Sequence, residues 1–259
     1  MADDAILLDV TDGLARVTLN RPARLNAVDP DAIARWQAIA HEVAERDDVG
    51  AVLLDASGRA FCAGGDVVAM SELAAEHDDA ATVITELADR IHDGHLTLRE
   101  SAKPIVAAVQ GPVAGGGLGF MLVADLVVAS EQATFASRYS DIGLTPDCGV
   151  STLLPEAIGT RRALELTLTR RTLTAAEALD WGLVTEVVAH DDVADRARAI
   201  ARSWLDGATG AFGQAKRLVR SGLARPFREA LDDEARTIGA AFATPEAQAR
   251  VATFAARRG

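Results

Sequence analysis

The chain has 259 residues, of which 49% are hydrophobic and 25% charged, and its formal net charge is −12 at pH 7. This composition is typical of a globular protein and excludes a disordered one, while the negative charge argues against a nucleic-acid partner, whose phosphates it would repel. No apolar run reaches the length of a membrane span, the first four residues lack the basic region of a signal peptide, and two cysteines, Cys62 and Cys148, cannot form a disulfide framework. We therefore expect a cytoplasmic protein that binds neither membranes nor nucleic acid.

Strands and helices alternate along the chain. Residues 5–20 predict a hairpin that turns at Asp12-Gly13. A helix is expected after Asp29, and its inward apolar stripe consists of Ile33, Trp36, Ile39 and Val43. Further strands are expected at 51–56, 104–109, 126–129, 134–137 and 183–188, and further helices at 67–75, 80–99, 118–124, from about 152, and from about 192 to the end. The alternation predicts an α/β fold, which we divide into a core of residues 1–191 and a helical region of residues 192–259.

Two glycine-rich turns follow predicted buried strands. The first is Phe61–Asp66 and the second is Gly111–Gly119, and each leads into a predicted helix. Backbone N–H groups at a helix N-terminus bind anions, so two such turns could hold one developing oxyanion. Neither turn has the glycine pattern of a dinucleotide-binding fold or the G-K-[ST] of a P-loop. The alternative interpretation is that the glycines only allow close packing.

Five segments together resemble the crotonase superfamily, also called enoyl-CoA hydratase/isomerase. They are residues 21–27 (RPARLNA), 63–66 (AGGD), 111–119, 142–147 (IGLTPD) and 175–184 (AAEALDWGLV). The resemblance implies a spiral of repeated ββα turns followed by C-terminal helices that build a homotrimer, often a dimer of trimers. It also implies an acyl-CoA thioester as ligand and no cofactor beyond its CoA moiety.

The resemblance also implies roles for individual residues. The backbone N–H groups of Ala63 and Gly116 would form an oxyanion hole for the thioester oxygen. The residues expected to contact CoA are Arg24, Leu25, Ala63, Gly65, Asp66 and Val67, together with Phe254 and Arg257 from a neighbouring subunit. For Asp66 the capping of the next helix is the preferred role of the side chain. The histidines show no metal-ligand spacing, so no metal site is expected.

The choice of reaction depends on three positions. Gly119 and Tyr139 occupy the positions where hydratases of the family carry two glutamates, which argues against hydration. Asp147 matches the aspartate of relatives that shift double bonds, where a single base moves a proton between C2 and C4. We therefore predict an enoyl-CoA isomerase with Asp147 as the catalytic base, and Gly119, Tyr139 and His92 in its substrate pocket.

Three alternative functions remain open at the level of the sequence, and so does a purely structural role for Asp147. In 4-chlorobenzoyl-CoA dehalogenase the matching aspartate attacks an aromatic carbon and a histidine activates water; His92 falls at that position, although Ile91 stands where a tryptophan is expected. The chain could also be a hydratase that uses another acid, or an acyl-CoA-binding relative without activity. Finally, Asp147 follows Pro146, which is ordinary turn chemistry without a catalytic role.

Overall fold

The structure, a computed structural model that describes residues 4–222 and 224–257, is built on two β-sheets. The larger sheet has the order β1-β2-β3-β4-β6-β9 and the smaller one the order β5-β7-β8. In the larger sheet β1 is antiparallel to β2, and every other neighbouring pair is parallel. The strands are β1 (Ile6–Thr11), β2 (Leu14–Leu19), β3 (Ala51–Ala56), β4 (Ile105–Val109), β5 (Val113–Ala114), β6 (Leu126–Ser130), β7 (Thr134–Ala136), β8 (Thr172–Thr174) and β9 (Glu186–Val188).

The chain passes repeatedly from one sheet to the other. It leaves β4 in the larger sheet for β5 in the smaller one, returns through α4 (Gly117–Leu122) to β6, and enters the smaller sheet again at β7 and β8. After α7 (Ala175–Trp181) it returns once more to the larger sheet at β9. This winding is the predicted spiral of strands and helices, and it confirms the α/β class.

Helices cover both faces of the larger sheet. Successive side chains of a strand point to opposite faces: Val52 and Leu54 of β3 pack with α1 (Pro30–Glu45) and α3 (Ala80–Glu100), whereas Leu53 packs with α8 (Val193–Asp206). The remaining helices are α2 (Val67–Glu76), α5 (Val150–Ile158), α6 (Thr160–Leu168), α9 (Thr209–Gly222), α10 (Phe227–Phe242) and α11 (Pro245–Ala256). None of the described helices is long and apolar enough to cross a membrane.

Helix α1 shows how the sequence sets an element that borders the site. Asp29 caps it by accepting a hydrogen bond from the N–H of Ala32 (2.9 Å), and Pro30 occupies its first position. All four residues of its predicted apolar stripe are buried. The Nε1–H of Trp36 donates to Nδ1 of His95 on α3 (3.0 Å), so the two helices are joined by a buried hydrogen bond as well as by apolar packing.

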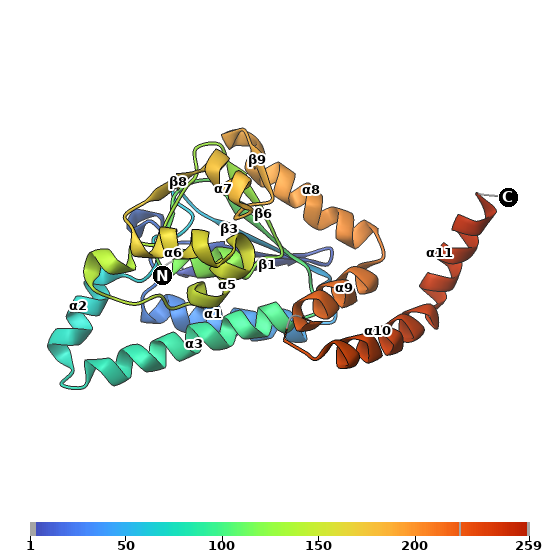
Figure 1. The fold of residues 1–259 in the computed structure, drawn as a ribbon, viewed down its shortest axis with the longest axis horizontal. Coiled ribbons are helices and arrows are strands. Elements are labelled where there is room, and N and C mark those ends of the chain that lie inside the picture. The colour runs from blue at the N-terminus through green and yellow to red at the C-terminus, as the bar shows by residue number, and fades with distance from the viewer. Residues whose placement is uncertain (1–3, 223, 258–259) are drawn as a thin grey trace.

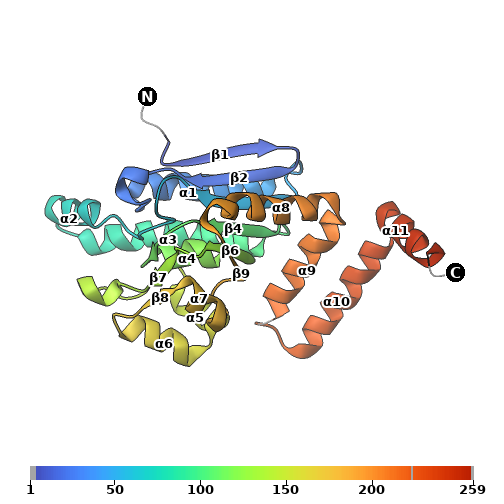
Figure 2. The same ribbon diagram turned by 90° about the horizontal axis from the view of Figure 1, so that it is seen from above.

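Two of the helices that follow the predicted boundary at residue 192 pack against the core. Helix α8 belongs to the core, since Val193, Ala197 and Ala201 are buried against the larger sheet. Helix α9 is also tied to it: the buried Nζ of Lys216 donates to the carbonyls of Leu98 and Lys103. By contrast α10 and α11 contain no buried residue: α10 lies beside α9, and α11 continues away from the core (Figures 1 and 2). We call these two helices, residues 227–256, the C-terminal arm.

Candidate active site

The two glycine-rich turns lie in contact. Cys62 and Val113 form a parallel bridge between them, and the N–H of Ala114 donates to the carbonyl of Cys62 (2.9 Å). Gly64, with a φ of +91°, packs so tightly that a Cβ there would lie 2.9 Å from the nitrogen of Gly116. Only glycine fits both the conformation and the contact. The distance between the turns is therefore set by backbone against backbone.

The backbone N–H groups of Gly65 and Gly116 are the unpaired donors of these turns that lie near Asp147. Val28 pairs with the neighbours of Gly65: its N–H donates to Gly64 and its carbonyl accepts from Asp66. The N–H of Gly65 therefore points away from Val28, and it has no hydrogen-bond partner among the described residues. The N–H of Gly116, just before α4, has no partner in the same part of the chain. Two adjacent free donors suit a negative charge that develops on an oxygen.

The N–H of Ala63 is not one of these donors, which corrects the sequence-based prediction. It donates to the carbonyl of Leu25 at 3.0 Å, and this bond ties the first turn to the loop of residues 21–27. The free group lies two residues later, at Gly65. The sequence could not show this, because the bridge to Val28 decides which N–H is left unpaired.

Asp147 lies beside the second turn. A Cβ on Gly116 would be 3.6 Å from Oδ1 of Asp147, 3.7 Å from the hydroxyl of Tyr139 and 2.9 Å from Sγ of Cys148. The side chain of Asp147 is half-buried and lines a cavity that Gly65 also lines. The structure thus brings one carboxylate next to the two free N–H groups.

Tyr139 contacts Asp147 rather than lining this cavity. Its hydroxyl donates to Oδ1 of Asp147 (2.6 Å) and lies 3.3 Å from the carbonyl of the same residue. Burial, together with the neighbouring Cys148 and Asp147, raises the pKa of Tyr139 far above its ordinary value. The phenol therefore stays protonated and acts as a hydrogen-bond donor.

His92 and Gly119 likewise contact the turn that carries Asp147 instead of lining the cavity. The N–H of Cys148 donates to Nε2 of His92 (3.2 Å), and Cys148 has a left-handed backbone (φ +50°). A Cβ on Gly119 would collide with the carbonyl oxygen of Cys148. No side chain fits at position 119, because the backbone of Cys148 occupies that space.

The cavity beside Asp147 is apolar and small. It lies between α1, α2 and α3, and its volume is about 40 Å³, which is room for a few water molecules. The thioether end of Met70 covers Gly65, since a Cβ there would lie 2.6 Å from its Cε. Any larger ligand therefore requires Met70 to move. The aliphatic side chains that line the cavity include Val28, Ile33, Leu73, Ile84, Leu87 and Ile91.

Asp66 is a structural residue held by α2 and by Arg21. It caps α2 by accepting from the N–H groups of Val68 (3.1 Å) and Ala69 (3.4 Å), and it pairs with Arg21 (3.1 Å). Partial burial opposes its charge, but these donors outweigh burial and lower its pKa. The expected capping role is confirmed. Arg21 was not predicted, although it also pairs with Asp29 (2.7 Å) and so joins α1 to α2.

Asn26 is a second residue of this loop that sequence reasoning missed. It is buried, it accepts from the N–H of Arg21 (2.8 Å), and its amide donates to the carbonyls of Ser57 and Ala60. Its backbone is left-handed (φ +56°), a conformation that asparagine tolerates better than most residues. That tolerance was the available signal in the sequence.

Of the remaining residues predicted to contact CoA, two lie near the first turn and two lie far from it. Arg24 and Val67 are exposed near the first turn, and the side chain of Arg24 makes no hydrogen bond or ion pair with the residues described. Phe254 lies on the C-terminal arm and Arg257 directly follows it, and the arm is at the opposite end of the molecule from α2 (Figures 1 and 2). Within one chain the structure does not bring these two residues to the candidate site.

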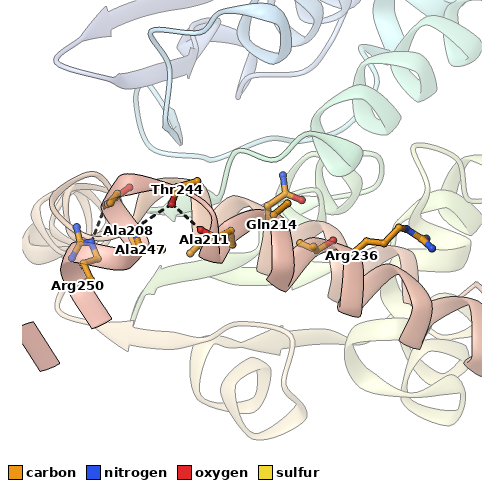
Figure 3. A pocket seen from close by; sticks show the side chains of 12 residues that line it. Ala208, Ala211, Gln214, Arg236, Thr244, Ala247 and Arg250 are labelled. Atoms are coloured by element: carbon orange, nitrogen blue, oxygen red, sulfur yellow. Dashed lines mark hydrogen bonds and ion pairs between the residues drawn. The ribbon is translucent and has the colours of Figure 1, made fainter. Parts of the chain in front are cut away.

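A larger hollow of about 530 Å³ lies elsewhere, between α9 and the C-terminal arm (Figure 3). Small side chains such as Ala208, Ala211 and Ala247 line much of it, with Gln214 and Arg236 along its length. Thr244 in this hollow caps α11 through the N–H of Ala247 (3.2 Å). The hollow does not reach Asp147 or either glycine-rich turn, so we treat it as a feature of the arm.

Comparisons with known proteins agree with this architecture. The family model described as enoyl-CoA hydratase/isomerase matches residues 9–259. A 4-chlorobenzoyl coenzyme A dehalogenase from an Arthrobacter species is 32% identical over 253 residues, covering 98% of this chain and 91% of that protein. The 1,2-epoxyphenylacetyl-CoA isomerase of Escherichia coli is 32% identical over 254 residues, covering 98% and 96%.

A solved structure of an enoyl-CoA hydratase from Mycobacterium smegmatis superposes with a TM-score of 0.90 at 28% identity. It covers 98% of this chain and 97% of that one. The names of these relatives cover three reactions, so likeness alone does not choose among them. Both the fold and the sequence nonetheless lead to one family. The chain belongs to the enoyl-CoA hydratase/isomerase family, the crotonase superfamily.

Proposed function

We propose that the chain is an enoyl-CoA isomerase that shifts a double bond by way of a thioester enolate. The thioester oxygen accepts hydrogen bonds from the N–H groups of Gly65 and Gly116. Asp147 removes a proton from C2 of a 3-enoyl-CoA and returns it to C4. Loss of one donor to such an oxyanion typically costs about 100- to 1,000-fold in rate, so both N–H groups matter to the reaction.

The observation that carries this proposal is the place of Asp147, next to Gly116 and at the cavity that Gly65 lines. Asp29, which also lines this cavity, pairs with Arg21. Asp147 lies next to Gly116, while the backbone of Cys148 fills the space that a side chain at position 119 would need. Asp66, another carboxylate near Gly65, forms an ion pair with Arg21 and caps α2. A reaction with one base needs only Asp147. Hydration by two carboxylates would need an acid at position 119, where a side chain would collide with the backbone of Cys148.

The CoA moiety is proposed to bind at the first turn. Arg24 is an exposed cation beside it, which a chain of net charge −12 needs in order to hold phosphates. Leu25, Gly65, Asp66 and Val67 supply backbone contacts. Phe254 and Arg257 would reach the same CoA from a second copy of the chain. No further cofactor is proposed.

The second copy is proposed to belong to a homotrimer, with a dimer of trimers as the larger form. Helix α10 carries an exposed apolar stripe in which Phe227 is 78% and Ile238 72% exposed. At 100° per residue this stripe lies well away from Asp233 and Thr237, which face α9 through Arg217. An apolar surface of this kind marks an interface.

The function is tested with Asp147→Asn and a 3-enoyl-CoA in deuterated water. The amide keeps the size and the acceptor for Tyr139 but cannot take a proton, so we expect isomerisation and labelling at C2 and C4 to fall at least 100-fold. The matched control is Asp141→Asn, an exposed aspartate paired with Arg138, which should keep full rate. Full activity in Asp147→Asn excludes the role, and binding without turnover in the unsubstituted protein indicates a relative without activity.

Hydrolytic dehalogenation is a second candidate because His92 lies beside the turn of Asp147. Its Nε2 accepts the N–H of Cys148 at 3.2 Å, so the lone pair that would activate water is already engaged. This observation places isomerisation first. Halide release from a halobenzoyl-CoA, abolished in His92→Gln, would reverse the order.

A further inference from the structure

Tyr139 holds one oxygen of Asp147 and leaves the other one open. Its hydroxyl lies 2.6 Å from Oδ1, close enough for a strong hydrogen bond to a carboxylate. No nitrogen or oxygen atom of residues 4–222 and 224–257 bonds to Oδ2, and the other group that interacts with this carboxylate is the buried thiol of Cys148. The two oxygens of the same carboxylate therefore have different surroundings.

The position of Tyr139 is itself fixed by its neighbours. The side chain is 8% exposed and belongs to the main apolar core. Its carbonyl accepts the N–H of Leu144 (3.0 Å), and the preceding Arg138, with a left-handed φ of +59°, is bonded to Thr172 (2.8 Å) on β8. The ring of Tyr139 is thus held by the apolar core, and the residue before it is linked to β8.

The backbone of the same turn is held from a different element. The N–H of Cys148 donates to His92 on α3, which supports the left-handed conformation of Cys148. Gly116 has no Cβ in the space next to Oδ1, Tyr139 and Cys148. The carboxylate is therefore fixed at its backbone by α3, at Oδ1 by Tyr139, and against the second turn by the absence of a side chain on Gly116.

We propose that Tyr139 is a positioning residue that keeps Oδ1 of Asp147 engaged, so that Oδ2 alone carries the proton. This inference rests on the proposed isomerase function. The C2–H bond breaks as Oδ2–H forms, and its electron pair moves into a dienolate held by Gly65 and Gly116. Oδ2–H then breaks as C4–H forms, and the double bond lies between C2 and C3.

If the carboxyl group of Asp147 cannot rotate, Oδ2 delivers to C4 the same proton that it removed from C2. Rotation would expose the proton to water and allow exchange before transfer to C4. Because Tyr139 blocks this rotation, a large share of the protons removed from C2 should reappear at C4 in the unsubstituted protein. The ratio of direct transfer to exchange reports on the hydrogen bond, whereas a merely structural role of Tyr139 would leave this ratio unchanged.

The test compares Tyr139→Phe with the unsubstituted protein, using a 3-enoyl-CoA in deuterated water. The phenyl ring conserves the packing and removes only the hydroxyl. We expect kcat to fall about 10- to 100-fold with KM changed less than about twofold, and deuterium incorporation per turnover to rise. Unchanged kcat and unchanged incorporation, while Asp147→Asn is inactive, overturn the inference and leave the proposed function intact. Activity in Asp147→Asn instead overturns the proposed function.

A second measurement does not depend on the fold of a variant. Tyr139 is the only tyrosine in the chain, so the ultraviolet titration of the intact protein follows this phenol alone. A donor held against a carboxylate stays protonated until the protein unfolds. Ionisation of the phenol at its ordinary pKa in the folded protein would show that Tyr139 does not hold Oδ1.

Discussion

Helices α4 and α10 lie in the same chain but have opposite surroundings. Every residue of α4, from Gly117 to Leu122, is buried, whereas α10 buries none of its residues within the chain. Helix α4 begins at one of the two free N–H groups, and α10 carries the exposed apolar stripe. The comparison shows that the candidate site is built on a helix buried within one chain, whereas the C-terminal arm leaves an apolar surface that no described residue of the chain covers.

The strongest way to test this difference is to make the same substitution in both helices. Gly119→Ala places a Cβ against the carbonyl oxygen of Cys148, and a buried backbone atom cannot move aside cheaply. We expect the free energy of unfolding to fall by about 3 kcal/mol or more, as measured by urea denaturation. A loss below about 1 kcal/mol would mean that the turn of Asp147 is looser than the structure shows.

The matched control is Gly239→Ala in α10. A Cβ at this position meets nothing within 4 Å, and alanine favours a helix interior over glycine by about 0.8–1.0 kcal/mol. This variant should therefore be slightly more stable. The same chemical change would then have opposite signs in the two regions.

A second effect, modest at any one pH step, concerns the histidine buried beneath α4. His95 packs edge-to-face against Phe120 and accepts the N–H of Trp36. Burial, assisted by the charge of His92, lowers its pKa to about 3 in the folded chain. The unfolded chain binds a proton near pH 6.5, so the folded state loses about 1.4 kcal/mol per pH unit as the pH falls from about 6.5 towards 3.

The variant His95→Gln lacks the imidazole, so its unfolding should take up one proton fewer below pH 6.5. Stability measured by denaturant at several pH values should then fall less steeply below pH 6.5 than in the unsubstituted protein. His77→Gln, at an exposed position, is the control and should keep the original slope. Equal slopes in all three proteins would place the source of acid sensitivity outside this cluster.

The smallest effect on the fold is expected in the C-terminal arm. Ile238→Ser with Phe242→Ser changes two exposed residues of the α10 stripe, so the core should unfold within about 0.5 kcal/mol of its original stability once the chains are separate. The mass in solution should fall from trimer to monomer by light scattering. Glu229→Ser, on another face of α10, should not change it. A trimer that survives the double substitution would remove the stripe from the interface.

Much of the fold could be predicted because local signals and burial agreed. The cap at Asp29, the stripe of α1 and the apolar run of β3 each indicated an element that the structure contains. Strands β5 and β8, with two and three residues, were not predicted. They are too short for a period of two to show, and only their pairing with β7 makes them strands.

The candidate site was predicted in its parts but not in its connections. The residues Gly116, Tyr139, His92 and Asp147 were all named, yet the sequence assigned Tyr139 and His92 to a pocket, and the structure shows them bonded to residues 147 and 148. Ala63 was chosen over Gly65 because spacing does not reveal which N–H a neighbouring strand has taken. The hydrogen bond of Tyr139 spans 8 positions, and those of Val28 and His92 span 36 and 56, so no local pattern records them.

The contact between Gly64 and the nitrogen of Gly116 has a consequence for how this site can change. Both free N–H groups belong to the main chain, so no side-chain exchange other than to proline can remove either donor. The side chains nearest to these donors, at positions 92, 139, 147 and 148, lie on other elements. If the proposed function holds, single substitutions at these positions would change the reaction, while the two donors to the thioester oxygen would be kept. Protein engineering of this site would therefore keep the N–H groups of Gly65 and Gly116 and substitute the side chains at these four positions.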